Sequence, residues 1–192
     1  MKEILESIFD KQRMLMEKYA VIEHNLIGSD NELEIPVDLD NRVAQARLRQ
    51  VAWWVVEELG EALSDIGNKE KFQEELIDAL HFLTELAILS GLEPQEITDK
   101  MSDDFCRLAE EDYVSILKVI HLLSRSMNCL KNKPWKQTPK KTNVKLYKIE
   151  LRSCFIGFIN LLLIDVDMSP QEIYDAYLGK NKENQRRQNE NY

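Results

Sequence analysis

Apolar residues recur every three or four positions along most of the chain, which is the spacing that one buried face of an α-helix produces. In the first segment the pattern runs through Ile4, Ile8, Leu15, Tyr19 and Ile22. No segment shows the alternation of apolar and polar residues that is typical of a strand. The chain is therefore predicted to be an all-α helical bundle, with helices over about 1–26, 41–66, 69–89, 94–101, 102–130 (a break near 112 being left open), 145–164 and from 170 towards the C-terminus.

Polar caps and prolines mark where these helices begin. Asp40 is predicted to cap the second helix and Asn68 the third, because short polar side chains bond the free N–H groups of a first turn. Pro94 and Pro170 occupy first-turn positions, where proline is tolerated. Two proline-containing segments are predicted to be irregular, an extended connector over 34–39 and a loop over 131–144.

The segment 74–101 resembles the segment 150–177, at a constant offset of 76 residues. The two share nine identities in 28 positions without a gap, including Pro-Gln-Glu-Ile in both. A duplication explains this likeness; the alternative is that Pro-Gln-Glu-Ile is a common helix start and that the rest is helical composition. We predict a single domain over 1–192, built from two degenerate helical repeats of about 41–101 and 110–177.

Two pairs of carboxylates carry the clearest chemistry, Glu58 with Glu61 and Glu75 with Asp78. Residues three apart share a helix face, so two helices packed side by side would direct all four carboxylates to one place. Like charges at short range need a cation between them, and carboxylate oxygens suit Mg²⁺. The four acids are therefore predicted to be metal ligands; the alternative is a solvated helix face.

The second repeat keeps the helical pattern but loses these acids. At the offset of 76 residues, Leu151 stands in place of Glu75 and Cys154 in place of Asp78. The active acids are thus predicted to lie in the first half only, which leaves the second half free for another role.

Cationic residues gather in that second half. Seven lysines occur between 131 and 148 with no acidic residue among them, and Trp135 lies in their middle. Near the C-terminus, steps of three, four and three residues place a mixed polar set along one helix face: Tyr177, Lys180, Asn184 and Arg187. Cations with an amide and a phenol suit a polyphosphate, whereas the alternative is a frayed and solvated terminal helix.

The composition and charge of the chain argue against several classes of function. The chain has 192 residues, 44% of them apolar and 31% charged, which is enough apolar material for a core. The net charge of -9 argues against a nucleic-acid partner. Three widely separated cysteines predict neither zinc nor a disulfide, which favours the cytoplasm. The first residues lack a signal-peptide pattern, and the longest apolar run, 155–164, is too short to span a membrane.

The paired acid motifs resemble those of the all-α nucleoside triphosphate pyrophosphatases, which include MazG-type enzymes and the dimeric dUTPases. Here they read Glu58-Leu-Gly-Glu61 and Glu75-Leu-Ile-Asp78. The C-terminal run from Tyr177 to Tyr192 is similar to the signature of the dimeric dUTPase and phage dCTPase–dUTPase group, although Asn191 stands where that group usually has glycine. The segment 131–137, Lys-Asn-Lys-Pro-Trp-Lys-Gln, resembles a segment of phage members.

The resemblance implies an Mg²⁺-dependent enzyme that cleaves a deoxynucleoside triphosphate to the monophosphate and pyrophosphate, and that forms a homodimer. Glu61 or Glu58 would also orient the attacking water. Gln12 is the candidate for contacting the base, and Trp135 either stacks on it or is a buried anchor. The implied phosphate-binding residues are Lys180, Asn184, Arg187 and Tyr192.

The sequence fits more than one substrate and more than one class of protein. The substrate is expected to be dUTP, with dCTP or the broader range of a MazG-type enzyme as alternatives. A di-iron bundle requires two Glu-x-x-His motifs, and the chain has only Asp78-x-x-His81, a histidine more simply explained by packing. A helical binding protein without catalytic activity is the alternative from another class.

Overall fold

The structure is a computed structural model that describes residues 1–27, 34–101, 111–133 and 135–190, the side chains of 20–27 excepted. These residues form helices and contain no strand, which confirms the predicted all-α fold. No described helix combines the length and apolar character that a membrane span requires. The elements in order are α1 (Lys2–Ile27), α2 (Arg42–Ser64), α3 (Lys69–Leu89), α4 (Pro94–Met101), α5 (Asp112–Cys129), α6 (Val144–Asn160), the π-helix η1 (Leu161–Asp165) and α7 (Pro170–Asn189).

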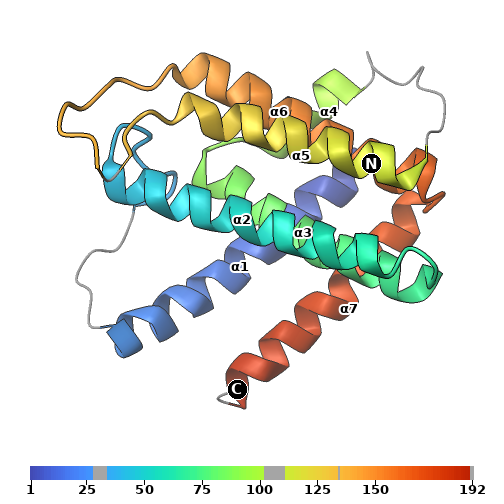
Figure 1. The fold of residues 1–192 in the computed structure, drawn as a ribbon. Coiled ribbons are helices and arrows are strands. Elements are labelled where there is room, and N and C mark those ends of the chain that lie inside the picture. The colour runs from blue at the N-terminus through green and yellow to red at the C-terminus, as the bar shows by residue number, and fades with distance from the viewer. Residues whose placement is uncertain (28–33, 102–110, 134, 191–192) are drawn as a thin grey trace.

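The bundle is organised around two helix pairs, α2 with α3 and α5 with α6 (Figure 1). The α5–α6 pair lies across one side of the α2–α3 pair, and α1 and α7 pack against α3 on the other side (Figure 1). The last turns of α7 extend away from the α5–α6 pair. This arrangement leaves α3 between α2 and α7, where the two predicted acid pairs and the cationic terminal helix can meet.

Helix ends among the described residues follow the sequence with one correction, and residues 102–110 of the helix predicted over 102–130 lie outside the described residues. Asn68 caps α3 and Ser169 caps α7 in a capping box with Glu172, as the short polar side chains predict. The prediction that Asp40 caps α2 is wrong, because Asn41 accepts bonds from the N–H groups of Val43 and Ala44. Asp40 instead accepts a 2.6 Å bond from the N–H of Thr142.

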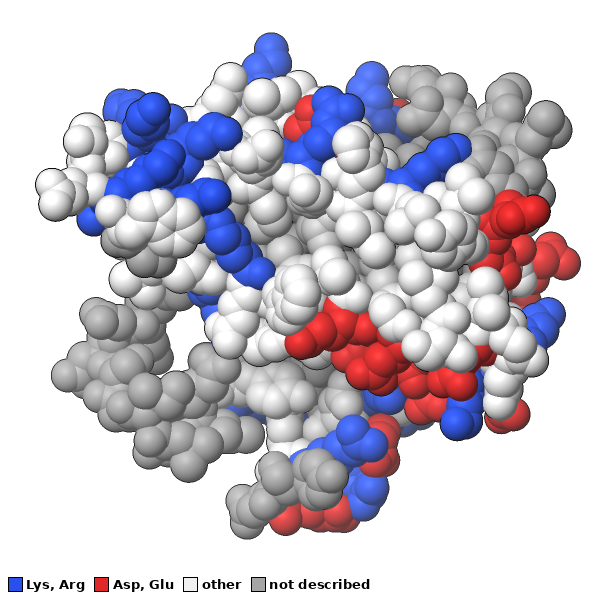
Figure 2. Space-filling view, viewed as in Figure 1, with Lys and Arg blue, Asp and Glu red and all other residues white. Residues whose placement is uncertain are grey.

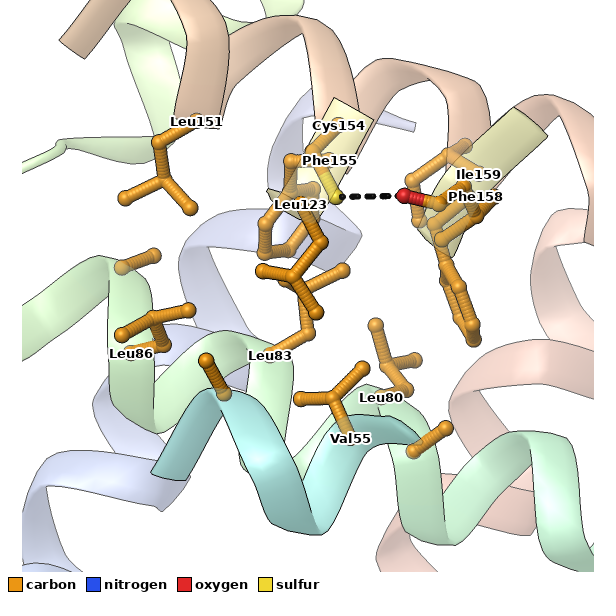
Figure 3. Packing of buried hydrophobic residues seen from close by; sticks show 14 of the residues in the cluster. Val55, Leu80, Leu83, Leu86, Leu123, Leu151, Cys154, Phe155, Phe158 and Ile159 are labelled. Carbon is orange, nitrogen blue, oxygen red and sulfur yellow. Dashed lines mark hydrogen bonds between the residues drawn. The ribbon is translucent and has the colours of Figure 1, made fainter. Parts of the chain in front are cut away.

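The core is one cluster that includes residues from both helix pairs (Figure 3). Leu151 and Cys154, which lie 76 positions after Glu75 and Asp78, are both fully buried there. The thiol of Cys154 lies 3.6 Å from the carbonyl oxygen of Val119, and burial raises its pKa to about 12. These positions of α6 therefore serve packing, whereas their counterparts on α3 carry charge.

Helix boundaries also follow the offset of the predicted repeat. Adding 76 to α3 gives residues 145–165, which is nearly the span of α6 and η1 together. The same addition carries the first residue of α4 to the first residue of α7, both of them prolines. The π-helix was not predicted. The duplication and the single-domain organisation themselves stay predictions.

The loop predicted over 131–144 ends at 143 in the structure, and buried polar side chains hold both of its ends. Asn132 donates from Nδ2 to the carbonyl oxygens of Asp40 and Lys140, and its Oδ1 accepts from the N–H of Lys140. The hydroxyl of Thr142 donates to the carbonyl oxygen of Leu39. Because buried polar groups that lose their partners are costly, these bonds hold the two ends of the loop in place.

Replacing Asn132 with alanine is expected to lower the free energy of unfolding by about 2–4 kcal/mol, because three backbone groups lose their partner. Urea denaturation monitored by circular dichroism measures this change. Asn128→Ala, at an exposed position of α5, is the matched control and should change stability by less than about 0.5 kcal/mol. Equal effects of the two substitutions would contradict the anchoring role.

Candidate active site

Three of the four predicted acids come together between α2 and α3. One carboxylate oxygen from each of Glu58, Glu75 and Asp78 lies within 4.8 Å of the others, and all three side chains are partly buried. The i, i+3 spacing on α3 places Glu75 and Asp78 on the face that α2 covers. Glu61 is more exposed and lies outside this trio, although its charge acts on both Glu58 and Glu75.

Burial and mutual repulsion make the ionised cluster unfavourable. Burial, followed by the charges of Asp78, Glu61 and Glu75, raises the pKa of Glu58 to about 7. The pKa values of Glu75 and Asp78 are also raised, in both cases mainly by burial. Carboxylates whose charged forms are held close together at a free-energy cost are a donor set that fits a hard divalent cation. The residues present therefore fit the Mg²⁺ that the resemblance implies.

Helix α7 brings a cation to the cluster. The ammonium of Lys180 lies 2.5 Å from Oδ2 of Asp78 and 3.4 Å from Oε1 of Glu74. Burial lowers the pKa of Lys180, but its hydrogen bond to Asp78 and the charges of both acids outweigh burial and raise it. Lys180 is therefore positively charged and bonded directly to a predicted metal ligand.

The other three predicted phosphate-binding residues have a less direct relation to the acids in the structure, and one of them is not described. Arg187 lies two turns beyond Lys180, bonds Glu183 at 3.0 Å, and its charge acts on Asp78. Asn184 is half-buried on the same helix, and Tyr192 lies outside the described residues. A groove of about 410 Å³ between α3 and α7 has Lys180 and Arg187 in its lining. Two of the three described residues thus border one groove, whose lining also includes Glu74.

A buried polar cluster joins three helices one turn away from Asp78. The hydroxyl of Tyr177 donates to Oε1 of Gln12 at 2.6 Å, and Nδ1 of His81 bonds the same oxygen at 3.1 Å. The rings of His81 and Tyr177 stack with their centroids 3.8 Å apart. Burial lowers the pKa of His81 to about 3, so the ring is neutral. Two more buried atoms of this region have no hydrogen-bond partner among the described residues, Nε2 of His81 and Nδ2 of Asn181.

Sequence reasoning did not bring these residues together. Tyr177 was grouped with the residues of α7 predicted to bind a polyphosphate, but its side chain is fully buried and donates to Gln12. Gln12 was a candidate only through the resemblance, and packing alone was expected to explain His81. Asn181 belongs to the C-terminal run that carries the resemblance but was given no role, although it lies four residues after Tyr177 and thus on the same face of α7. This four-residue spacing is the sequence pattern from which Asn181 could have been predicted to lie near Tyr177.

Trp135 is not among the residues that the fold brings together. Its side chain is 74% exposed, in the loop whose Gln137 carbonyl oxygen accepts from Arg42 at the start of α2. Glu58 lies 16 residues further along α2, or roughly 24 Å at 1.5 Å per residue. The alternative prediction that Trp135 is a buried anchor is wrong, because its side chain is exposed. Its predicted contact with the base stays a prediction, and within one chain the structure gives it no support.

The raised pKa of Glu58 predicts that Mg²⁺ stabilises the protein more at pH 8 than at pH 6. Above a pKa of about 7 the carboxylate is ionised and ready to bind, whereas below it the cation must displace a proton. The rise in Tm on adding Mg²⁺ should be several degrees at pH 8 and roughly half as large or less at pH 6. Differential scanning fluorimetry measures both. Glu57→Gln, on the exposed side of α2, should behave as wild type; equal shifts at the two pH values would contradict this role for Glu58.

The all-helical fold, the acids that meet across α2 and α3, and the cationic α7 define the class of helical nucleotide pyrophosphohydrolases. A family model described as dUTPase matches residues 4–192, nearly the whole chain, and the protein belongs to that family. It is a dUTP diphosphatase-like nucleotide pyrophosphohydrolase. Comparisons with curated proteins and with solved structures gave no match.

Proposed function

We propose that this protein hydrolyses dUTP to dUMP and pyrophosphate in a reaction that requires Mg²⁺ held by Glu58, Glu75 and Asp78. The observation that carries the proposal is the meeting of these three carboxylates within 4.8 Å, beside a lysine from another helix. When bound, Mg²⁺ neutralises the triphosphate and activates water. Glu61, the more exposed acid beside the cluster, completes the ligand set or orients the water.

The cations of α7 bind the phosphates in this proposal. Lys180 lies against Asp78 and Glu74 in the structure and exchanges these carboxylates for phosphate oxygens when the triphosphate is present. Arg187 lies on the same side of α7 and adds a planar guanidinium, with Asn184 between the two in sequence. Tyr192 completes the predicted set.

The buried polar cluster supplies the base-binding side of the site. Gln12 bonds both Tyr177 and His81 one helical turn from Asp78 and Lys180, and Asn181 lies one turn beyond Tyr177 on α7. The unpartnered Nδ2 of Asn181 is a donor suited to a carbonyl oxygen of a pyrimidine. Neutral amide and hydroxyl groups of this kind suit uracil, and cytosine is the alternative because it shares one carbonyl oxygen. The homodimer that the resemblance implies is part of the same proposal.

Purified protein assayed with Mg²⁺ against dUTP, dCTP, dTTP, dATP and dUDP tests this function. We expect dUTP to be cleaved fastest, with dUMP and pyrophosphate as the products, and no turnover after chelation of the metal. Preference for dCTP would support the dCTPase alternative, and turnover of all five would support a MazG-type enzyme. Absence of pyrophosphate release from every nucleotide would leave the non-catalytic binding protein as the better interpretation.

A further inference from the structure

A groove of about 370 Å³ lies between α5 and α6, at the end of this pair where the loop over 131–143 joins them. Three cations from three segments line it, namely Arg125 of α5, Lys131 at the start of the loop and Lys141 near its end. Glu150 of α6 is the acid in its described lining, and the other lining residues are uncharged. The groove therefore has a surplus of positive charge, although the net charge of the chain is -9.

The acid of the groove is already paired with one of these cations. Nη2 of Arg125 donates to Oε1 of Glu150 at 2.5 Å, and Glu150 is buried. The guanidinium keeps further N–H donors beyond this bond. Lys131 and Lys141 form no ion pair with a described residue. The described part of the chain thus supplies no counter-charge for the two lysines, and an anion in the groove would balance them.

Buried anchors hold the backbone beside both lysines. Lys131 directly precedes Asn132, and Lys141 directly precedes Thr142. Both anchors are buried and bond backbone groups of neighbouring segments, as described above. Asn143 caps α6 beside the groove, so the positive end of the helix dipole adds to the field there. Because the backbone around the cations is fixed, less conformational entropy is lost when they bind a ligand.

Further cations surround the groove. Seven lysines occur between 131 and 148 with no acidic residue before Glu150. Figure 2 shows lysines and arginines gathered at the upper left, where the loop and the adjoining ends of α5 and α6 lie in Figure 1. Acidic residues form a separate group lower on the same face. A positive potential of this kind raises the local concentration of anions and the rate at which they bind.

The groove is separate from the acid cluster within one chain. Its lining contains none of the residues assigned to the candidate active site. Arg49 of α2 donates to the carbonyl oxygen of Leu130, which places the end of α5 beside Arg49. Glu58 lies nine residues further along α2, or about 14 Å at 1.5 Å per residue. An anion in the groove and a metal ion among the acids would therefore occupy different places.

We propose that the groove lined by Arg125, Lys131 and Lys141 is a second binding site, which takes a phosphate-bearing anion of up to nucleotide size. Guanidinium and ammonium groups are the donors that bind phosphate oxygens. The volume of the groove lies within the range of small-molecule sites, and Leu146 adds an apolar surface for a sugar or a base. This inference is independent of the proposed function, because the site uses none of the residues proposed to bind the metal, the triphosphate or the base.

Cys129 reports whether the groove is occupied, because its partly buried thiol belongs to the lining. Burial and the charge of Glu150 raise the pKa of this thiol, against the opposing effect of Lys131 and Arg125. A bound anion covers the sulfur and offsets these two cations, so it should slow alkylation by iodoacetamide. Timed labelling followed by peptide mass spectrometry measures the rate at Cys129 alone. Cys154 is fully buried, and its labelling checks that the fold is intact.

Pyrophosphate, inorganic phosphate and dUMP are the probes, each added with EDTA so that the metal site stays empty. We expect about 1 mM pyrophosphate to slow the labelling of Cys129 about tenfold at about 150 mM salt, which corresponds to a dissociation constant of about 0.1 mM. The labelling of Cys154 should not change. Stronger protection by dUMP than by phosphate would support a nucleotide as the ligand, and protection by pyrophosphate and phosphate alone would support an inorganic anion.

Paired substitutions test whether the groove itself binds the anion. Lys131→Gln with Lys141→Gln should remove most of the protection of Cys129. Lys136→Gln with Lys145→Gln is the matched control, since it removes the same charge from the same run of lysines outside the lining, and it should keep the protection.

A second control separates the groove from the cations of α7. Lys180→Gln with Arg187→Gln removes the proposed phosphate-binding cations and should leave the protection of Cys129 unchanged. Loss of protection in this variant would assign the anion to the α7 groove and overturn the proposal.

Three further results would overturn the second site. The first is equal protection in the two lysine variants, which would indicate diffuse attraction to the lysine run. The second is protection that disappears at about 150 mM salt, which would indicate an adventitious ion only. The third is no protection by any probe. Because the labelling needs no turnover, failure of the protein to cleave dUTP would reject the proposed function and leave the result at the groove intact.

Discussion

Replacing Glu58 with glutamine is expected to lower kcat/KM for dUTP by about 1,000-fold or more while making the protein more stable in the absence of metal. Glu58 is the acid of the trio contributed by α2, and no other trio member can replace it from that helix. Loss of a metal ligand removes several kcal/mol of stabilisation from the transition state. Steady-state assays at saturating Mg²⁺ measure the loss.

The gain in stability follows from the sign of the pKa shift. The pKa of Glu58 rises from 4.5 to about 7 on folding, so ionisation opposes folding, and this cost develops as the pH rises from about 4.5 to above 7. A pKa shift of this size corresponds to roughly 3 kcal/mol in the free energy of unfolding for a fully buried group. The side chain of Glu58 is only half-buried and solvent screens its charge, so the expected gain is about 1 kcal/mol. Urea denaturation with EDTA at pH 8 should show the gain, and at pH 4 it should vanish.

Glu57→Gln is the control for both measurements, because this neighbour is exposed and its carboxylate accepts from the indole of Trp53 instead. It should leave the activity within a few-fold of wild type. Unchanged activity of Glu58→Gln, or destabilisation of the metal-free protein at pH 8, would be inconsistent with a carboxylate held for a cation.

Replacing Gln12 with leucine is expected to lower the free energy of unfolding by about 2–4 kcal/mol, the largest stability effect predicted for a polar residue of the site. Leucine is similar in size but cannot accept a bond, so the Tyr177 hydroxyl and Nδ1 of His81 lose the oxygen that they share. Thermal unfolding should show a fall in Tm of about 5–12 °C in a chain of this length.

The same substitution should raise KM for dUTP by tenfold or more with a smaller effect on kcat, because in the proposed function the disturbed residues contact the base rather than the water and phosphates. Gln171→Leu, at an exposed position of α7, is the matched control and should change neither quantity appreciably. A stable Gln12→Leu protein with wild-type KM would remove Gln12 from the site.

The parts of the site that depend on local geometry could be predicted from the sequence. Glu75 and Asp78 face one direction because an α-helix fixes that relation for residues three apart, and the turn between α2 and α3 then brings Glu58 to them. Local sequence patterns also predicted the helices, the prolines in the first turns of α4 and α7, and the cap at Asn68. Which of Asp40 and Asn41 caps α2 depended instead on Thr142, a residue 102 positions away that binds Asp40.

The parts that depend on packing between distant helices could not be predicted. Gln12, His81 and Tyr177 come from α1, α3 and α7, and nothing in their spacing indicates that they share hydrogen bonds. The position of Trp135 is a similar case, since the composition of its loop gave no indication that α2 separates the loop from the acids of the same chain. Glu61 matched the predicted face and is nonetheless more exposed than its partner Glu58.

The reactivity of the buried Cys154 thiol reports local unfolding in the second half of the molecule. A thiol reagent can reach a fully buried sulfur whose pKa is about 12 only when α5 and α6 separate. The acids and cations of the proposed nucleotide site belong to α2, α3 and α7, so nucleotide binding there and this opening concern different helices. The labelling rate of this one atom therefore reveals whether ligand binding at one end of the bundle protects the other end, and so whether the two halves unfold together or separately.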